Sequence, residues 1–382
     1  MMSETRLSRA ELHCVRVTPK TSWSFIRLHT AEGLTGEGEA TLFGQDPAQL
    51  RAAEHLVPLA LREASLRSPG EFAQRHVPDD RVQSSVVSAL DQALWSLHAQ
   101  GNAQSLAGSL GPRRERIPVY ANINRRTVSR GPVDFAASAQ AAKAEGHVAF
   151  KLAPFDEVDP KVCMQGDGVK AMLPGLARVA AVREVVGNSA RLMVDCHWRF
   201  DEATAAVLNE AAAKLGVYWI ETPIPEVEAN IPALVRLRGQ CTALGMRQAG
   251  LETSVGWDQL RPYCEAGAYD VVMPDVKYIG GLCELRKTID GCVEHGVQVS
   301  LHNPSGPVSH AFSLQVSATM DAFDLLELQF DESPLFEQLV GSPVLPVHRG
   351  FAELPVGHGL GVSLVPGLLK QHAEWPAREW TA

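Results

Sequence analysis

From Ile117 onward, short apolar runs alternate with longer segments of helical periodicity, at intervals of roughly thirty residues. Strands joined by helices run parallel, and successive units of this kind are typical of a closed α/β barrel. An open, doubly wound sheet is the alternative, but no Gly-x-Gly-x-x-Gly follows the first predicted strand, which counts against a dinucleotide-binding fold. The predicted strands are 117–122, 147–152, 191–196, 217–221, 246–251, 270–274, 297–301 and 323–327.

The chain before this region has a different pattern. Three runs, Leu12–Val17, Ser24–Thr30 and Glu39–Leu42, indicate an antiparallel meander, and helices are predicted at Pro47–Ala64 and Val82–Gln100. Strands followed by helices indicate a separate α+β unit. The predicted fold is therefore α/β: a modified (β/α) TIM-type barrel over residues 113–344, with an α+β capping domain over residues 1–112 that residues 345–382 complete.

Charge and cysteine content exclude several classes of protein. The 382 residues carry a net charge of −9 without a basic cluster, which argues against binding to nucleic acid. No apolar run reaches bilayer length, and Met1–Val17 lacks the apolar core of a secretory signal, so we expect no membrane association. The seven cysteines are scattered and form no Cys-x-x-Cys, which predicts reduced thiols in a cytoplasmic protein.

Three consecutive predicted strands end in a carboxylate, at Asp195, Glu221 and Glu252. In a parallel barrel the carboxyl ends of the strands meet at one face. Three ionised carboxylates held together repel one another unless a cation is bound between them. Oxygen-only ligation suits a hard divalent ion such as Mg²⁺. A single acid at a strand end is usually solvated, but three in succession predict a metal site.

Two histidines are expected at the same face. Asp275 and His302 follow neighbouring strands, so the carboxylate can fix the tautomer of the imidazole and raise the basicity of its other nitrogen. His197 comes two residues after Asp195, and strand alternation would direct both side chains to one side. A lone histidine at such a position is otherwise a structural residue.

Taken together, these residues resemble the mandelate racemase subgroup of the enolase superfamily, over essentially the whole chain. The segments Ile279-Gly-Gly281 and Gly359-Leu-Gly361 also fit this resemblance. It implies one Mg²⁺ per subunit, a catalytic dyad and an acid on the eighth strand. The positions carried over are Asp195, Glu221 and Glu252 as metal ligands, Asp275 and His302 as the dyad, and Glu327 as the acid.

The departures from the family pattern indicate the reaction. The subgroup's racemases carry Lys-x-Lys on the second strand, and here Lys151 takes the first position while Ala153 takes the second. His197 stands where sugar acid dehydratases of this family, such as those acting on galactonate, place a histidine acid. The resemblance therefore implies an Mg²⁺-dependent dehydratase of a sugar acid, an aldonate or aldarate. His302 would be the base and His197 the acid.

Other assignments stay open at this point. In the predicted mechanism Lys151 adds positive charge beside the substrate carboxylate, although it could be the base, and Glu327 hydrogen-bonds a carboxylate oxygen. A racemase, epimerase or cycloisomerase on the same scaffold is the main alternative, and a non-catalytic relative that binds metal or ligand is the third.

The expected partner is a small molecule, and relatives suggest a homo-oligomer. Specificity is expected from the cap loops Thr18–Trp23 and Leu42–Pro47, and from Asn122, Asn124, Lys277 and Trp23. Trp198 and Trp257 are further candidates for the mouth.

Overall fold

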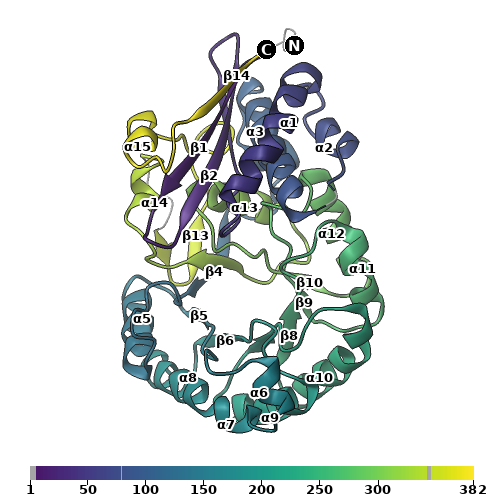
Figure 1. Cartoon of the computed structure of the whole chain (residues 1–382), viewed down its shortest axis with the longest axis vertical. Helices are drawn as coiled ribbons and strands as arrows, with labels where there is room; N and C mark the ends of the chain where they lie inside the picture. The colour runs from purple at the N-terminus through teal and green to yellow at the C-terminus, as the bar shows by residue number, and fades with distance from the viewer. Residues whose placement is uncertain (1–5, 79, 342–345) are drawn as a thin grey trace.

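The computed structural model describes residues 6–78, 80–341 and 346–382 (Figure 1). Parallel strands form the ring in the lower half of the molecule, and the ring closes because β11 pairs with β4 and Val299 bridges Phe323. The predicted barrel is confirmed. Its strands are β4 (Arg116–Asn122), β5 (Ala149–Leu152), β6 (Arg191–Asp195), β7 (Trp219–Glu221), β8 (Arg247–Gly250), β9 (Val271–Val272), β10 (Gln298–Val299) and β11 (Leu326–Gln329).

Helices cover the outside of the ring (Figure 1). In α9 the Asp201 side chain accepts a hydrogen bond from the Thr204 amide at 2.8 Å, which caps the start of the helix. Gly216, with φ of 65°, follows its end. The main helices are α5 (Pro132–Ala144), α8 (Leu173–Val186), α9 (Glu202–Lys214), α10 (Ile231–Ala243), α11 (Trp257–Glu265), α12 (Leu282–Glu294) and α13 (Pro307–Ser317). Short helical turns are α6 (Pro160–Met164), α7 (Gly168–Ala171), η1 (Glu228–Asn230) and α14 (Leu335–Gln338).

Large side chains fill the barrel interior. Tyr120 and Trp219 are fully buried and pack edge to face, with ring centroids 5.6 Å apart. Met193, Val271 and Met273 belong to the same buried cluster. The barrel is therefore a packed core, and ligands have room only at its rim.

The cap lies above the barrel, in purple in Figure 1. Its sheet has the order β14-β1-β2-β3. The third strand was expected at Glu39–Leu42, which is wrong, because the preceding glycine run forms the strand. A Cβ at Gly36 or Gly38 would lie 2.2 or 1.9 Å from a carbonyl oxygen of α3, so only glycine allows the helix to pack this closely. The elements are β1 (Leu7–Arg16), β2 (Ser22–Thr30), β3 (Thr35–Glu39), α1 (Asp46–Glu63), α2 (Glu71–Arg75), α3 (Arg81–Gly101) and α4 (Leu106–Leu110).

The C-terminal segment joins both parts of the molecule. Its strand β13 (Phe351–Glu353), preceded by β12 (Val347–His348), pairs with the barrel strand β4. After α15 (Pro366–Gln371), β14 (Arg378–Thr381) pairs with β1 of the cap. The expected boundary between residues 344 and 345 lies outside the described residues, and the assignment of 345–382 to the cap stays a prediction.

Helix α3 fastens the cap to the barrel rim. The Ser84 hydroxyl donates to the carbonyl oxygen of Tyr278 at 2.6 Å, and the Leu282 amide donates to Asp91 at 2.7 Å. Both contacts reach the segment that follows β9. Within the described parts of the chain, no helix has the length and apolarity needed to cross a bilayer.

Candidate active site

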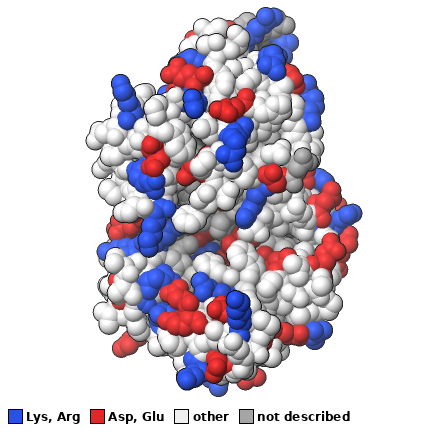
Figure 2. Space-filling model, in the orientation of Figure 1, with Lys and Arg blue, Asp and Glu red and all other residues white. Residues whose placement is uncertain are grey.

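A cavity of about 970 Å³ lies between the cap and the carboxyl ends of the barrel strands. Figure 2 shows the hollow between the upper and lower halves of the molecule, with Lys and Arg side chains along its edges. Thr21 and Ser22 line it from one predicted cap loop, and Leu42 and Phe43 line it from the other. Both cap loops therefore face the cavity as expected.

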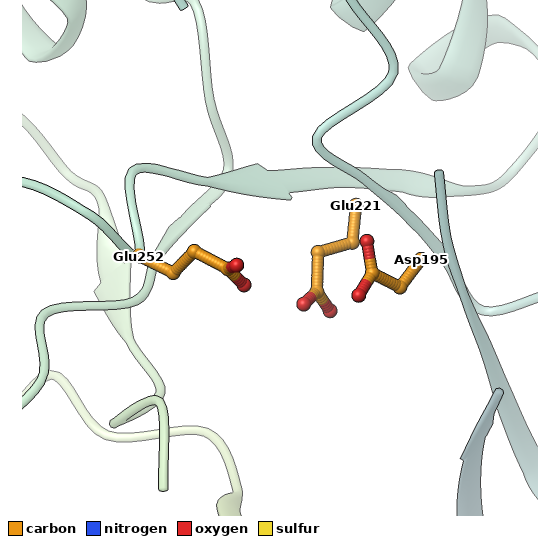
Figure 3. A group of neighbouring side chains, drawn as sticks. All are labelled: Asp195, Glu221 and Glu252. Atoms are coloured by element: carbon orange, nitrogen blue, oxygen red, sulfur yellow. The ribbon is translucent and has the colours of Figure 1, made fainter. Parts of the chain in front are cut away.

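The three predicted metal ligands converge beneath this cavity. Asp195 and Glu221 are the last residues of β6 and β7, and Glu252 follows β8 by two residues. One oxygen of each carboxylate lies within 4.8 Å of the other two, and all three side chains are buried. Figure 3 shows Glu252 approaching from one side and Glu221 and Asp195 from the other.

The electrostatics of this triad fit a bound cation. Burial raises the pKa of Glu221 to about 7. Burial, together with the charges of Asp195 and Glu221, raises the pKa of Glu252 well above its ordinary value. Glu252 Oε2 is buried and has no hydrogen-bond partner in the described structure. A hard divalent cation would neutralise these groups and take the free oxygen as a ligand.

Lys151 lies behind the triad and bonds two carboxylates. Its Nζ is 2.6 Å from Glu221 Oε1 and 2.9 Å from Glu327 Oε1, and the side chain is 1% exposed. Burial alone would lower the pKa of Lys151, but these carboxylates outweigh burial and hold it well above its usual value. A lysine held protonated is a poor base. Ala153, where a second base would stand, lines the cavity.

Glu327 lies at the end of the barrel next to Lys151. The side chain is fully buried and accepts hydrogen bonds from Asn122 Nδ2 at 2.7 Å and from the Asn303 amide at 2.9 Å. Burial would raise the pKa of Glu327, but Lys151 outweighs burial and lowers it. In this structure Glu327 holds Lys151 and the Asn303 loop, and its hydrogen bond to a substrate carboxylate stays a prediction.

The Asp275–His302 dyad has the predicted geometry. His302 Nδ1 is 2.8 Å from Asp275 Oδ2, and Nε2 points toward the triad, 3.6 Å from Glu252 Oε2. Burial lowers the pKa of His302 despite the neighbouring carboxylate of Asp275. Donation from Nδ1 to Asp275 leaves the Nε2 lone pair free on the cavity side. The imidazole is placed to accept a proton.

His197 reaches the cavity by a route that differs from the prediction. Strand β6 ends at Asp195, so alternation does not apply, and His197 and Trp198 both have left-handed backbones with φ of 48° and 58°. This turn folds the imidazole back, with Nε2 2.6 Å from Asp195 Oδ2. The charge of Asp195 raises the pKa of His197. His197 lines the cavity, and its raised pKa favours the protonated form that a proton donor needs.

The other expected contact residues divide into two groups. Asn122, Asn124 and Lys277 line the cavity, and so does Trp198. Trp23 was expected at the substrate, which is wrong, because its indole is fully buried against Phe25 and Phe336. Trp257 packs on the outside of the barrel, stacked on His295 with ring centroids 6.3 Å apart.

Tyr278 and Arg81 are among the lining residues that the sequence analysis did not name. The Tyr278 hydroxyl is 3.2 Å from His302 Nδ1, because a tight turn after Asp275 brings the ring round to the imidazole. The Arg81 guanidinium lies over the Tyr278 ring, 5.8 Å from its centroid. Arg81 begins a helix of the cap, so no sequence spacing connects it to the barrel residues.

Curated relatives include several sugar acid enzymes. The chain is 29% identical to D-gluconate dehydratase of Thermoproteus tenax over 77% of this chain, an alignment that spans only 57% of that enzyme's length. It is 26% identical to D-xylonate dehydratase of Haloferax volcanii, over 92% of this chain and 85% of the relative. It is 29% identical to D-galactarolactone cycloisomerase of Agrobacterium fabrum, over 85% of this chain and 79% of the relative.

Family models and solved structures agree with the fold. The mandelate racemase/muconate lactonizing enzyme N-terminal domain model matches residues 5–111, and the enolase C-terminal domain-like model matches residues 134–367. The structure of a mandelate racemase/muconate lactonizing enzyme from Jannaschia sp. CCS1 superimposes with a TM-score of 0.84 at 23% identity, covering 98% of this chain and 99% of that one. The chain therefore belongs to the mandelate racemase subgroup of the enolase superfamily.

Proposed function

We propose that this enzyme dehydrates a sugar acid, an aldonate or aldarate, to a 2-keto-3-deoxy acid. One observation carries the proposal: two histidines, His302 paired with Asp275 and His197 with a pKa raised by Asp195, line one cavity beside the carboxylate triad, while Ala153 stands at the position of a second base. Elimination of water needs one base and one acid. Racemisation needs a proton donor on each face of the carbanion.

Asp195, Glu221 and Glu252 would hold the metal, for which we propose Mg²⁺ because all three ligands are carboxylates. When bound, a divalent ion supplies Lewis-acid stabilisation of charge on the substrate carboxylate. Lys151, paired with Glu221 at 2.6 Å, adds further positive charge behind this site. These groups orient the substrate with its α-carbon toward the imidazole of His302.

His302 takes the α-proton onto Nε2, and Asp275 stabilises the imidazolium through the Nδ1 hydrogen bond of 2.8 Å. His197 gives a proton to the β-hydroxyl group, which leaves as water. The resulting enol tautomerises to the 2-keto-3-deoxy acid. Each positioned acid or base contributes about 10²–10⁴-fold to the rate.

The dehydratases among the relatives support this reaction class, and their names support a sugar acid as the small-molecule substrate. One relative, the galactarolactone cycloisomerase, favours a second candidate, an isomerase on the same scaffold. In that reaction His197 would return a proton to carbon, in place of the missing second lysine. A protein that only binds its ligand is the third candidate, and the His302–Asp275 pair argues against it because binding alone needs no oriented base.

A panel of aldonates and aldarates, incubated with the enzyme and Mg²⁺ in deuterated water, tests the proposal. We expect a 2-keto acid from at least one substrate, detected with semicarbazide, and its disappearance with EDTA. Deuterium at the α-carbon without keto acid would instead support the isomerase. Binding of a sugar acid with neither exchange nor keto acid would favour the non-catalytic candidate.

A further inference from the structure

Glu39, the last residue of β3 in the cap, is a fully buried carboxylate that reaches into the barrel. Its Oε1 accepts a hydrogen bond from the Gly306 amide at 2.7 Å, and its Oε2 accepts one from the Ser309 amide at 2.9 Å. Gly306 is the N-cap of α13, and Ser309 lies in its first turn. Amides at a helix start have no acceptor within the helix, and a negative charge there is favourable.

Helix α13 follows directly on the loop that carries His302. Residues 302–306 are fastened at one end by the Asn303 amide, which donates to Glu327 at 2.9 Å. In the middle of the loop the Ser305 hydroxyl contacts Lys277 Nζ, and this amine is 2.6 Å from Asp275 Oδ2. Glu39 holds the other end. The loop is thus fixed from the barrel at Asn303 and from the cap at Gly306.

The contact is too close to be incidental. A Cβ at Gly306 would lie 2.9 Å from both oxygens of Glu39 and 2.9 Å from the Trp23 ring. Burying a carboxylate carries a large desolvation penalty unless hydrogen bonds replace its water. Here the replacements come mainly from the barrel helix that follows His302.

We propose that Glu39 is a positioning residue for His302, so that the cap sets the geometry of the base as well as covering the substrate. The role of His302 as base is taken from the proposed function. A misplaced base of this kind loses turnover while substrate binding at the triad persists.

The chain provides a matched control on the same strand. Glu37 lies two residues earlier on β3, is 3% exposed, and accepts from the Leu364 amide at 2.9 and 3.0 Å. It therefore makes the same kind of contact between a buried carboxylate and a backbone amide. Its partners, the Leu364 amide and Arg27 Nε at 3.3 Å, belong to the C-terminal segment and to β2, and neither belongs to the His302 loop.

The test compares Glu39→Gln with Glu37→Gln as Mg²⁺-loaded enzymes, measuring Tm, KM and the rates of α-proton exchange and dehydration. We expect Glu39→Gln to lower both rates by about 10- to 100-fold, with KM changed by less than about threefold. Glu37→Gln should lower Tm and keep both rates. Equal loss of rate in the two variants, or full rates in Glu39→Gln, would overturn the proposal.

Two further measurements keep the proposal testable. If Glu39→Gln does not fold, Gly306→Ala perturbs the same contact from the barrel side. This variant should also lower the rates of α-proton exchange and dehydration. Crystal structures of the variants give a readout without activity: the separation of 2.8 Å between His302 Nδ1 and Asp275 Oδ2 should change in Glu39→Gln and not in Glu37→Gln. If residues 302–306 keep their position in Glu39→Gln, the positioning role is refuted, even when the wild type dehydrates no substrate. If these residues move but the wild type has no turnover, only the proposed function is refuted.

Discussion

Replacing Lys151 by methionine would remove the cation that joins two buried carboxylates, Glu221 and Glu327, at 2.6 and 2.9 Å. Methionine matches the length of the lysine stem, so packing changes little and the loss is mainly one of charge. Without metal, Glu221 and Glu327 would face each other with no cation between them. Breaking a buried ion pair from one side costs about 3–5 kcal/mol of folding free energy.

The corresponding change in melting temperature follows from the size of the chain. An unfolding entropy of about 2.1 cal/mol/K per residue gives about 0.8 kcal/mol/K for 382 residues that melt together. A loss of 3–5 kcal/mol therefore lowers Tm by about 4–6 °C. A metal bound at the triad would neutralise Glu221, so the decrease in Tm should be smaller in saturating Mg²⁺ than in EDTA.

Differential scanning calorimetry at a fixed scan rate, in EDTA and in Mg²⁺, measures both effects. Lys170→Met, at an exposed lysine of α7, is the control and should shift Tm by less than about 1 °C. If Lys151→Met melts within about 1 °C of the wild type in EDTA, a buried pair of this kind does not stabilise this barrel and the reasoning is refuted.

Three further predictions use the same enzyme. Glu221→Gln removes one of the proposed anionic ligands and should weaken Mg²⁺ binding by about tenfold or more in calorimetric titrations, and full activity at limiting metal would contradict this. His302→Asn should stop α-proton exchange in deuterated water, whereas His197→Asn should lose dehydration and keep exchange, and loss of neither would reject the two roles. Burial raises the pKa of Asp91 to about 7, so the folded protein holds this proton more tightly than the unfolded chain does. The stability that the Asp91 proton contributes is complete below about pH 4 and is lost as pH rises toward 7. The plot of Tm against pH should therefore be flatter in this window for Asp91→Asn than for the wild type. Parallel plots for the two proteins would contradict the assignment.

The barrel and the triad could be predicted because their signals are local. Each strand is an apolar run, and Asp195 and Glu221 end their strands in the structure as they do in the sequence. Parallel topology then brings the carboxyl ends of the strands together, independently of the conformation of the loops. The Asp275–His302 pair was predictable for the same reason.

The remaining features depend on contacts between distant segments or on backbone conformation. His197 reaches the cavity through a left-handed turn that strand alternation does not foresee. The glycines of β3 resemble a turn until helix α3 is seen packed on them. Trp23 is the second residue of β2, and only the position of Phe336, more than three hundred residues later, shows that its ring is buried. Arg81 and Tyr278 meet because the cap docks on the barrel.

The pairing of β1 with β14 has a consequence for biosynthesis. Arg9 lies opposite Thr381, so this edge of β1 receives its partner only after the 372 residues that follow Arg9, up to Thr381, have been synthesised. At synthesis rates of about 5–20 residues per second, the nascent edge waits for about 20–70 s. An unpaired strand edge readily pairs with other chains during such an interval. The edge of β1 is thus protected long after it emerges, and slow translation or a lack of chaperones should reduce the yield of folded enzyme before any step at the active site is affected.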